Sequence, residues 1–417
     1  MSKDVSPARG FRDYAPADKA RRDRLLSTIR GVYAEHGFAE IETPVVEPLD
    51  RLRSSDGGDN VGMIFAIQRR GLSVEDAHAV GAVHELCDLG LRYDLTVPLS
   101  RFYASEHARL PRVARLIQIA PVWRAERPQK GRFRQFTQCD IDIIGEPGPL
   151  AETELVTTTL TALDALGVRG ATVRINDRRL LKALLESAGV ADERRAAVLV
   201  VIDKRDKIGL EQVQQQLDEL DLGDGVAATL GRHLQRFASG PIDADEFATL
   251  LDASDEATVA LDDHRTIVAG VEALVGPGVV RFDPTLVRGL GYYTGTIFEV
   301  EHPESGSSIG GGGRYDGMVG RFLGRDVPAC GFSLGFERLV DLAPDPEASG
   351  PQRIALVYTD DAPATEILTE KRAWIARGHA VTLVPRAKNM RRVLDEVRAL
   401  GIAAYATLGS DELRDLQ

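Results

Sequence analysis

The chain has 417 residues, which is more than one hydrophobic core of ordinary size requires and predicts two or three domains. Its formal net charge of −12 argues against a protein coated in nucleic acid, although a local basic site is compatible with that charge. No stretch is long and apolar enough to span a bilayer, and residues 1–10 lack the apolar centre of a secretory signal. The three cysteines are scattered, which is typical of a reducing cytoplasm and of a protein without disulfides.

The first part of the chain mixes helical and strand patterns. Apolar side chains recur with helical spacing from residue 19, and Gly37 is a typical helix end. Strands are indicated by alternating or continuous apolar runs, one of which ends at Pro44. The elements expected in this order are a helix at 19–36, strands at 38–44, 113–123 and 139–145, a helix at 150–166 and a strand at 169–175.

Residues 175–280 are rich in Leu, Asp and Ala with helical spacing, which predicts a mostly helical insertion. Strand character returns at 278 and runs through 298–300 to an expected glycine-rich turn at 310–313. Residues 328–342 predict a strand followed by a helix, and 344–351 have the composition of a linker. After the linker, strands at 354–358, 381–384 and 403–408 alternate with helices at 364–377 and 389–400, as in a small α/β domain.

The pattern of the whole chain favours the α+β class. A catalytic domain of antiparallel strands is expected to be interrupted by the helical insertion and followed by the small α/β domain. The expected domains are a first catalytic part at 1–174, the insertion at 175–280, a second catalytic part at 281–344 and the C-terminal domain at 352–417.

The segment from residue 124 to 142 carries the strongest chemical signal. A basic turn lies between two apolar strands, and alternation places Arg124 and Glu126 on one face. The same rule places Gln138, Asp140 and Asp142 together on the return strand. Guanidinium groups suit phosphate because they offer planar, bidentate donors. A solvated hairpin tip is the simpler interpretation of a basic turn, but the apolar flanks and converging carboxylates favour a binding site.

This segment, Arg-Ala-Glu-Arg-Pro-Gln-Lys-Gly-Arg-Phe-Arg-Gln-Phe at 124–136, resembles motif 2 of class II aminoacyl-tRNA synthetases in its histidyl form. Several matching blocks in family order make chance agreement implausible, whereas any one of them would be weak. The other resembling blocks are motif 1 at 37–44, an amino-acid-binding strand at 91–98, two histidine signatures at 286–295 and 310–317, and motif 3 at 331–339.

The resemblance implies a fold, substrates and roles for single residues. It implies a class II synthetase catalytic domain that takes ATP, Mg²⁺ and histidine, charges tRNA(His), works in the cytoplasm and forms a homodimer through motif 1. Magnesium would bridge the ATP phosphates, with no metal ligand assigned to the protein itself. The residues implied for ATP are Arg124, Glu126, Arg132, Phe136 and Arg338. Those implied for histidine are Asp94, Thr96 and Gln138 for its ammonium group, Asp142 and Tyr293 for its imidazole, Arg288 for its carboxylate, and also Tyr292. Those implied for the tRNA acceptor end are Gln129, Lys130 and Arg132.

Arg288 and Arg124 are the implied catalytic residues. A carboxylate that attacks the α-phosphorus of ATP brings two anions together, so fixed positive charge and positioning do most of the work. No general base is needed, because the carboxylate of an amino acid is already ionised.

Two departures from the family leave other functions open. Gly291 stands where the family usually has aspartate, and the C-terminal domain resembles the anticodon-binding domain only at its start and is shorter. Besides a tRNA ligase, the chain therefore fits a synthetase paralogue that activates an amino acid for another acceptor. A third possibility is a non-catalytic regulatory subunit of ATP phosphoribosyltransferase, against which the intact Arg124, Glu126, Arg288 and Arg338 argue.

Overall fold

The computed structural model describes residues 5–54, 61–128, 132–252, 254–287, 291–344 and 351–416. The chain divides into two compact units. Unit 1 comprises residues 1–12 and 25–344, and unit 2 comprises residues 13–24 and 345–417. The finer division into four domains stays a prediction. Within the described ranges, no helix combines the length and the apolarity needed to cross a membrane.

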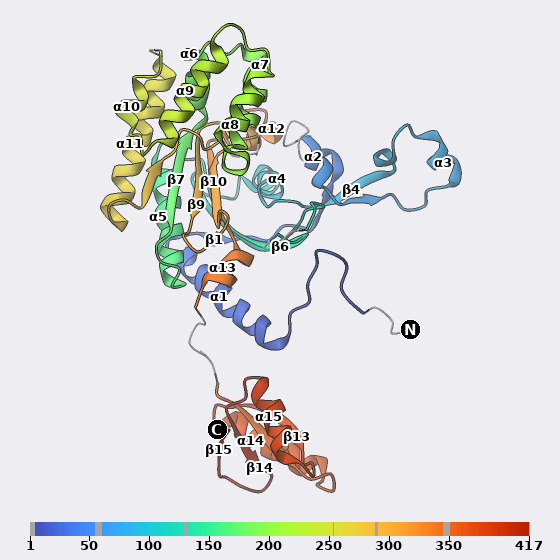
Figure 1. Ribbon diagram of the computed structural model, residues 1–417. Coiled ribbons are helices and arrows are strands. Elements are labelled where there is room, and N and C mark those ends of the chain that lie inside the picture. Colours follow the sequence, from blue (N-terminus) through green and yellow to red (C-terminus); the bar gives the residue numbers. More distant parts are fainter. Residues whose placement is uncertain are drawn as a thin grey trace. The chain divides into compact units, whose positions relative to one another are not determined.

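The largest sheet of unit 1 has, among the described residues, eight strands in the order β1-β5-β6-β11-β10-β9-β7-β8. Figure 1 labels β1, β6, β7, β9 and β10 of this sheet. Neighbouring strands are antiparallel except for the pairs β1–β5 and β7–β8 at the two edges. This sheet confirms the expected α+β class. The strands are β1 Ala39–Glu40, β5 Ala114–Trp123, β6 Gln135–Ile144, β7 Thr172–Asp177, β8 Val280–Phe282, β9 Thr296–Glu301, β10 Gly310–Arg314 and β11 Ala329–Gly335.

One face of this sheet carries the main core of unit 1. Helix α5 (Leu150–Ala165) contributes Leu155 to it, and the second half of α1 (Pro16–Glu35) contributes Tyr33. Alternate residues of β6, such as Ile141, point into the same core. Because side chains alternate along a strand, the intervening residues of β6 face the opposite side. Helices α4 (Thr96–Glu106), α12 (Asp316–Leu323) and α13 (Phe336–Leu342) complete the surroundings of the sheet.

The chain between β7 and β8 is helical and forms a second core. Leu180, Leu181, Leu184 and Leu185 are all buried, which is the spacing of one apolar helix face. Asp177 caps the first of these helices by accepting a hydrogen bond of 2.8 Å from the backbone N–H of Arg179. The helices, green to yellow in Figure 1, are α6 Arg178–Ser187, α7 Asp192–Asp203, α8 Arg205–Asp218, α9 Val226–Ala238, α10 Ala244–Ala248 and α11 Asp255–Val275.

Unit 2 contains a sheet in the order β13-β12-β14-β15. Strand β12 is parallel to both of its neighbours, as expected for a small α/β domain. The short antiparallel strand β15 was not expected. The elements are β12 Arg353–Tyr358, α14 Ala364–Ala376, β13 Ala380–Pro385, α15 Met390–Ala399, β14 Ala404–Thr407 and β15 Arg414–Asp415.

A small sheet with the order β2-β4-β3 precedes the candidate site in the chain and was also not expected from the sequence. Its strands are too short to show a hydrophobic period. Its elements are β2 Val46–Pro48, α2 Leu49–Ser54, the 3-10 turn Val61–Met63, β3 Ala66–Gln68, α3 Val74–Ala79, the 3-10 turn Val83–Leu86 and β4 Cys87–Leu91.

Four strand predictions need correction. The strand implied at 91–98 includes only Leu91, the last residue of β4, and Thr96 already begins helix α4. The strand expected at 38–44 is only Ala39–Glu40, because the carbonyl oxygens of Thr43 and Pro44 accept hydrogen bonds of 2.7 and 3.3 Å from the Arg92 guanidinium rather than from a strand. Strand β6 begins at Gln135 rather than at 139, since its polar half is paired with β5 as fully as its apolar half. The glycine-rich turn expected at 310–313 is the central strand β10.

The glycines of β10 are required by close packing between strands. A Cβ atom on Gly312 would lie 1.9 Å from the carbonyl oxygen of Gly331 and 2.8 Å from the Cα of Phe332, both backbone atoms of β11. Gly312→Ala is therefore expected to destabilise unit 1 by about 1–3 kcal/mol, the usual cost of overpacking. Urea unfolding measures this cost, and Gly317→Ala, with nothing within 4 Å of its Cβ, is the control. Equal stabilities of the two variants would contradict the prediction.

Candidate active site

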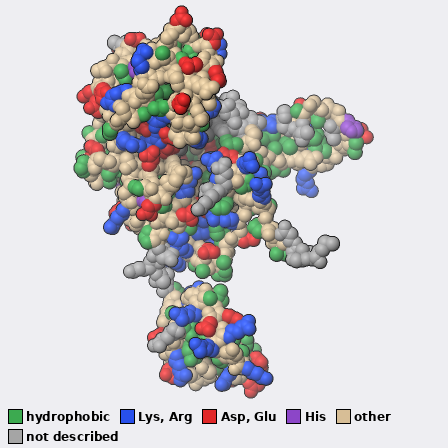
Figure 2. Space-filling view, viewed as in Figure 1, with side chains coloured by type: hydrophobic (Ala, Val, Ile, Leu, Met, Phe, Trp, Pro, Cys, Tyr) green, Lys and Arg blue, Asp and Glu red, His purple; other side chains and the backbone are tan. Residues whose placement is uncertain are grey.

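A cavity of about 970 Å³ opens on the face of the main sheet opposite the core. Figure 2 shows basic and acidic side chains close together over this part of the molecule. Arg288, Gln129 and Lys130 lie outside the described residues, so the structure does not place them. The cavity is lined by all the other residues that the sequence indicated, namely Asp94, Thr96, Arg124, Glu126, Arg132, Phe136, Gln138, Asp142, Tyr292, Tyr293 and Arg338.

Strand β6 supplies a row of side chains along the floor of the cavity. Phe136, Gln138, Asp140 and Asp142 all line it, as the alternation predicted. At about 3.3 Å per residue, Phe136 and Asp142 lie about 20 Å apart along the strand. The row thus has an aromatic end and an acidic end, long enough to hold two small substrates in line.

The aromatic end carries positive charge. The guanidinium carbon of Arg124 lies 5.1 Å from the centroid of the Phe136 ring, and its Nε donates a hydrogen bond of 3.0 Å to the carbonyl of Tyr93. Arg132 pairs with Glu126 at 3.3 Å across the turn between β5 and β6. Arg338, on α13, donates to the carbonyl oxygen of Ser308. These groups form a stacking surface and a set of cations suited to a purine nucleotide.

Asp142 dominates the acidic end. The hydroxyl of Tyr315 donates a hydrogen bond of 2.6 Å to its Oδ1. Burial raises the pKa of Asp142 to about 7; the Tyr315 hydrogen bond opposes this rise, and the charge of Asp94 adds to it. Gly331 lies opposite Asp142 on β11, where a Cβ would come within 2.0 Å of the carboxylate oxygen. Asp142 is therefore a buried hydrogen-bond acceptor, and glycine at position 331 leaves room for its carboxylate.

A hydrogen-bonded chain occupies the middle of the row. Gln138 Nε2 donates to Ser333 Oγ at 2.9 Å and lies 3.4 Å from Asp140 Oδ2. Ser333 also hydrogen-bonds to Asp140. Burial raises the pKa of Asp140 well above its usual range, and the charges of Asp142 and Asp94 raise it further, while the Ser333 hydrogen bond and the charge of Arg124 lower it.

Three tyrosines stand over the acidic end. The rings of Tyr292 and Tyr293 are 4.9 Å apart, and those of Tyr292 and Tyr315 are 6.2 Å apart. Tyr292 hydrogen-bonds to the side chain of Thr96, which connects it to the start of α4. A Cβ on Gly313 would lie 2.9 Å from the Tyr293 ring. The missing side chain at Gly313 therefore leaves room for this ring.

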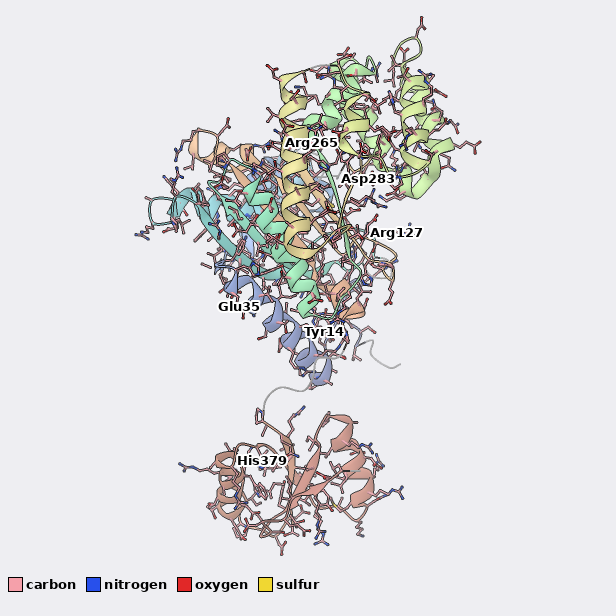
Figure 3. The ribbon with its side chains drawn as sticks, turned by 90° about the vertical axis from the view of Figure 1, so that its left-hand side faces the viewer. Tyr14, Glu35, Arg127, Arg265, Asp283 and His379 are labelled. Carbon is pink, nitrogen blue, oxygen red and sulfur yellow. The ribbon has the colours of Figure 1, made fainter. Side chains whose placement is uncertain are left out.

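Arg174 organises a further wall of the cavity. Its buried guanidinium contacts Asp283 at 2.6 Å, Glu301 at 3.0 Å, Glu299 at 3.1 Å and Asp206 at 3.3 Å. Figure 3 labels Asp283, just beyond β8. The cation belongs to β7, and the carboxylates come from just after the end of β8, from β9 and from the first turn of α8. The cluster therefore connects the sheet to the helical part of unit 1.

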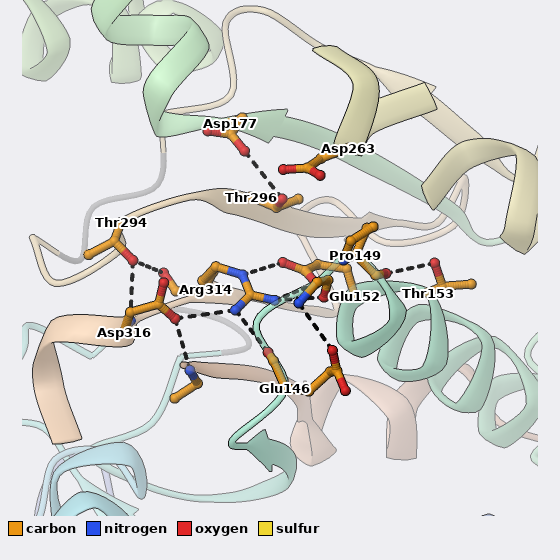
Figure 4. Close-up of polar contacts among 12 residues, drawn as sticks. Glu146, Pro149, Glu152, Thr153, Asp177, Asp263, Thr294, Thr296, Arg314 and Asp316 are labelled. Carbon is orange, nitrogen blue, oxygen red and sulfur yellow. Dashed lines mark hydrogen bonds and ion pairs between the residues drawn. The ribbon is translucent and has the colours of Figure 1, made fainter. Parts of the chain in front are cut away.

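A second buried arginine fixes the segment that carries Tyr315. Arg314 makes a bidentate pair with Glu152 of α5, at 2.6 and 2.7 Å, and a contact of 3.3 Å with Asp316 (Figure 4). It also donates to the carbonyl of Gly148 at 3.1 Å. Tyr315 is the next residue along the chain, so this anchor positions the hydroxyl that meets Asp142.

Several lining residues were not indicated by the sequence. Tyr315 lies in the second histidine signature, 310–317, and a tyrosine beside a run of glycines is a signal for a hydroxyl that reaches a binding site. Ser333 lies in the motif 3 block, one strand away from Asp140. Arg174 had no local signal, because its four acidic partners come from distant parts of the chain.

The largely antiparallel sheet and its helices are consistent with the catalytic domain of a class II aminoacyl-tRNA synthetase. The Histidyl-tRNA synthetase family model matches residues 10–339, and the chain belongs to this family. It is 50% identical to the histidine--tRNA ligase of Leifsonia xyli subsp. xyli (strain CTCB07), covering 99% of this chain and 97% of the relative. It is 41% identical to the probable histidine--tRNA ligase of Tropheryma whipplei (strain Twist), covering 97% and 96%.

A solved structure supports the same assignment. The histidyl-tRNA synthetase of Nostoc sp. PCC 7120 superposes with a TM-score of 0.78 at 26% identity, over 99% of this chain and 95% of that chain. The alignment with the Leifsonia protein covers nearly all of both chains. The short C-terminal domain is therefore no departure from that relative.

Proposed function

We propose that the protein activates histidine with ATP, forming histidyl-adenylate, and transfers the histidyl group to tRNA(His). The polar row of β6 is the observation that carries this proposal. Its aromatic end, with Arg124 over Phe136, suits ATP, and its acidic end at Asp142 suits an imidazole N–H. The names of the relatives, histidine--tRNA ligase, point to the same reaction.

In the first step, a carboxylate oxygen of histidine forms a bond to the α-phosphorus of ATP, and the bond to the β-phosphate oxygen breaks to release pyrophosphate. Negative charge builds on the α-phosphate as the two anions meet, so fixed cations lower the barrier. Arg124 and Arg338 line the cavity and would hold the phosphates. Arg288 would add a donor at the α-phosphate, on the strength of its position in the family signature.

Mg²⁺ bound together with ATP would supply positive charge that offsets the charge of the phosphates and of the leaving pyrophosphate. In the part of the chain that the structure describes, no group of three His, Cys, Asp or Glu side chains is arranged to hold a metal. Glu299 and Glu301 line the cavity but are paired with Arg174.

In the second step, the histidyl group passes to the acceptor end of tRNA(His). The turn between β5 and β6 carries Arg127 and Arg132, and Gln129 and Lys130 belong to the same segment of the sequence. Contacts of these cations with phosphate would give an affinity that falls as salt rises. The cytoplasm is the proposed compartment, in keeping with the free cysteines Cys87, Cys139 and Cys330.

Two assays on the same preparation test the proposal. Histidine-dependent exchange of pyrophosphate into ATP measures the first step, and charging of tRNA with radiolabelled histidine measures both. Activity in both assays is the expected result. Exchange without charging would show a paralogue with another acceptor. No exchange would overturn the proposal and favour a regulatory protein.

The protein is further proposed to be a homodimer. Within the described part of the chain, strand β1 is an edge strand with exposed residues that pairs with β5 on one side. Val45, just beyond it, is 38% exposed. An unpaired edge with apolar neighbours is suited to a two-fold contact with a second copy. Sedimentation equilibrium at micromolar concentration should give twice the chain mass of 45.3 kDa, whereas a monomer mass would contradict the dimer.

A further inference from the structure

Asp140 occupies the centre of the β6 row, between Gln138 and Asp142, and the roles proposed above do not use it. Its exposed fraction is 5%, and it lines the cavity. It lies opposite Ser333 on β11 and opposite Gln118 on β5. Gln118 hydrogen-bonds instead to Thr43 and to the carbonyl of Leu95. The nearest contacts of Asp140 are therefore on the Gln138–Ser333 side.

The hydrogen bonds around Asp140 fix the direction of the Gln138 amide. Its NH₂ group donates to Ser333 and faces Asp140 Oδ2, so its oxygen faces away from them. Among the described residues, neither Gln138 Oε1 nor Asp140 Oδ1 has a hydrogen-bond partner, although both atoms are buried. Buried acceptors without donors are costly, so both oxygens are suited to a ligand that donates.

The charge of the surroundings restricts the ligand. Asp94, Asp140 and Asp142 all line the same cavity, and the charges of Arg124 and of the buried Arg92 both act on Asp140. Arg92 does not line the cavity, and its guanidinium donates to the carbonyl oxygens of Pro121, Thr43 and Pro44. An ammonium group has three donors, no acceptor and a positive charge, which match acceptor oxygens in an acidic surrounding. Asp140 is two residues from Asp142, about 6.7 Å along the strand. That spacing suits the two nitrogen-bearing ends of one histidine molecule.

We propose that Asp140 is a further substrate-binding residue, whose carboxylate receives the α-ammonium group of the amino acid together with the amide oxygen of Gln138. The proposal rests on the proposed function, because it assumes that histidine binds with its imidazole at Asp142. It gives Asp140 a direct part in selecting an amino acid over an imidazole compound without an amine.

A purely structural role is the competing explanation. In that case Asp140 would only hold Ser333 and Gln138 in place, and its loss would disturb the whole floor of the cavity. Either every ligand of the acidic end would then bind more weakly, or, if only the Gln138 amide moves, Ser333→Ala would weaken binding of L-histidine as much as Asp140→Asn does. A direct contact with the ammonium predicts a loss confined to ligands that carry an amine.

The test measures binding of two ligands by calorimetry to the full-length chain. L-histidine carries the ammonium group, and imidazole-4-propionate has the same ring and carboxylate without it. Asp140→Asn keeps the size of the side chain and removes its charge. We expect this variant to bind L-histidine about 10- to 100-fold more weakly, which is the value of a hydrogen bond to a charged group. Its affinity for imidazole-4-propionate should stay within about 3-fold of that of the unmodified protein.

Two further variants separate the explanations. Ser333→Ala breaks the hydrogen-bonded chain but keeps the carboxylate, so it should weaken L-histidine less than Asp140→Asn does. Asp142→Asn removes the imidazole contact, so it should weaken both ligands.

Either of two results with Asp140→Asn would overturn the inference and leave the proposed function standing: unchanged binding of L-histidine, or equal weakening of the two ligands. Failure of the unmodified protein to bind L-histidine would overturn the proposed function first, and the inference with it.

Discussion

Replacing Asp142 with alanine is expected to lower kcat/KM for histidine by about two to three decades and to leave the KM for ATP nearly unchanged. The estimate corresponds to the loss of one partner from a buried, charged hydrogen bond, about 3–4 kcal/mol. The effect is selective because Asp142 lies about 20 Å along β6 from Phe136, where ATP is proposed to bind. A defect at one end of the row therefore does not reach the other end directly.

The size of the effect follows from the surroundings of Asp142. Its exposed fraction is 4%, so water does not replace the lost acceptor easily. Alanine also leaves the hydroxyl of Tyr315 without the oxygen that it meets at 2.6 Å. A site built on hydrogen bonds to a polar ring discriminates strongly, because its own polar groups are left unpaired when the match fails.

Pyrophosphate exchange at varied histidine and varied ATP gives both constants for Asp142→Ala. Tyr315→Phe is the matched control, since it removes one hydroxyl and keeps the carboxylate and the ring. It should raise the KM for histidine in the same direction but by about one decade at most, the value of one hydrogen bond. Equal losses for histidine and ATP in Asp142→Ala would show that Asp142 supports the fold of the cavity rather than reading the substrate.

The sequence predicted best those parts of the site that are close together in the chain. Arg124, Phe136, Gln138 and Asp142 belong to one hairpin. Strand alternation grouped Gln138 with Asp142 on the return strand, and the resemblance of this segment to motif 2 indicated Arg124 and Phe136. Helix α5 was also predicted within one residue at its end, because sixteen residues contain several turns of the apolar period.

Features that depend on contacts between distant segments could not be predicted in the same way. The glycines of β10 resemble a turn in the sequence, and only the closeness of the β11 backbone shows why a strand needs them. Arg174 forms ion pairs with carboxylates up to 127 residues away in the chain, so no local pattern predicts its role. Asp140 was seen on the right face, but its link to Gln138 depends on Ser333, which comes from another strand.

Glu152→Ala is expected to lower the stability of unit 1 by about 3–5 kcal/mol, because it removes the buried, bidentate counter-charge of the Arg314 guanidinium and leaves it the longer ion pair with the partly exposed Asp316. The exposed fractions of the Glu152 and Arg314 side chains are 2% and 9%. Burial raises the pKa of Glu152 while the Arg314 hydrogen bonds lower it, so the pair balances desolvation against attraction. Removing one partner keeps the desolvation cost of the other and loses the attraction.

The same helix offers a control with matched geometry. Glu154 makes a bidentate pair with Arg115 at 2.6 and 2.7 Å, but the two side chains are 21% and 30% exposed. Water screens that pair, so Glu154→Ala should cost about 1 kcal/mol or less. Urea unfolding followed by Trp123 fluorescence reports on unit 1 when Trp374, the second of the two tryptophans, is replaced by phenylalanine. Similar losses for the two glutamate variants would contradict the burial argument.

A double substitution separates the charge of the Glu152–Arg314 pair from its space-filling role. Glu152→Met combined with Arg314→Met removes both charges and keeps most of the volume, so stability should return to within about 1–2 kcal/mol of the original. The catalytic readout should not recover in the same way. Arg314 also holds the carbonyl of Gly148 and the carboxylate of Asp316, and Tyr315 follows it directly in the chain. The KM for histidine should therefore stay raised in the restored double variant. Recovery of both stability and KM would show that any well-packed pair at these positions can place Tyr315 against Asp142.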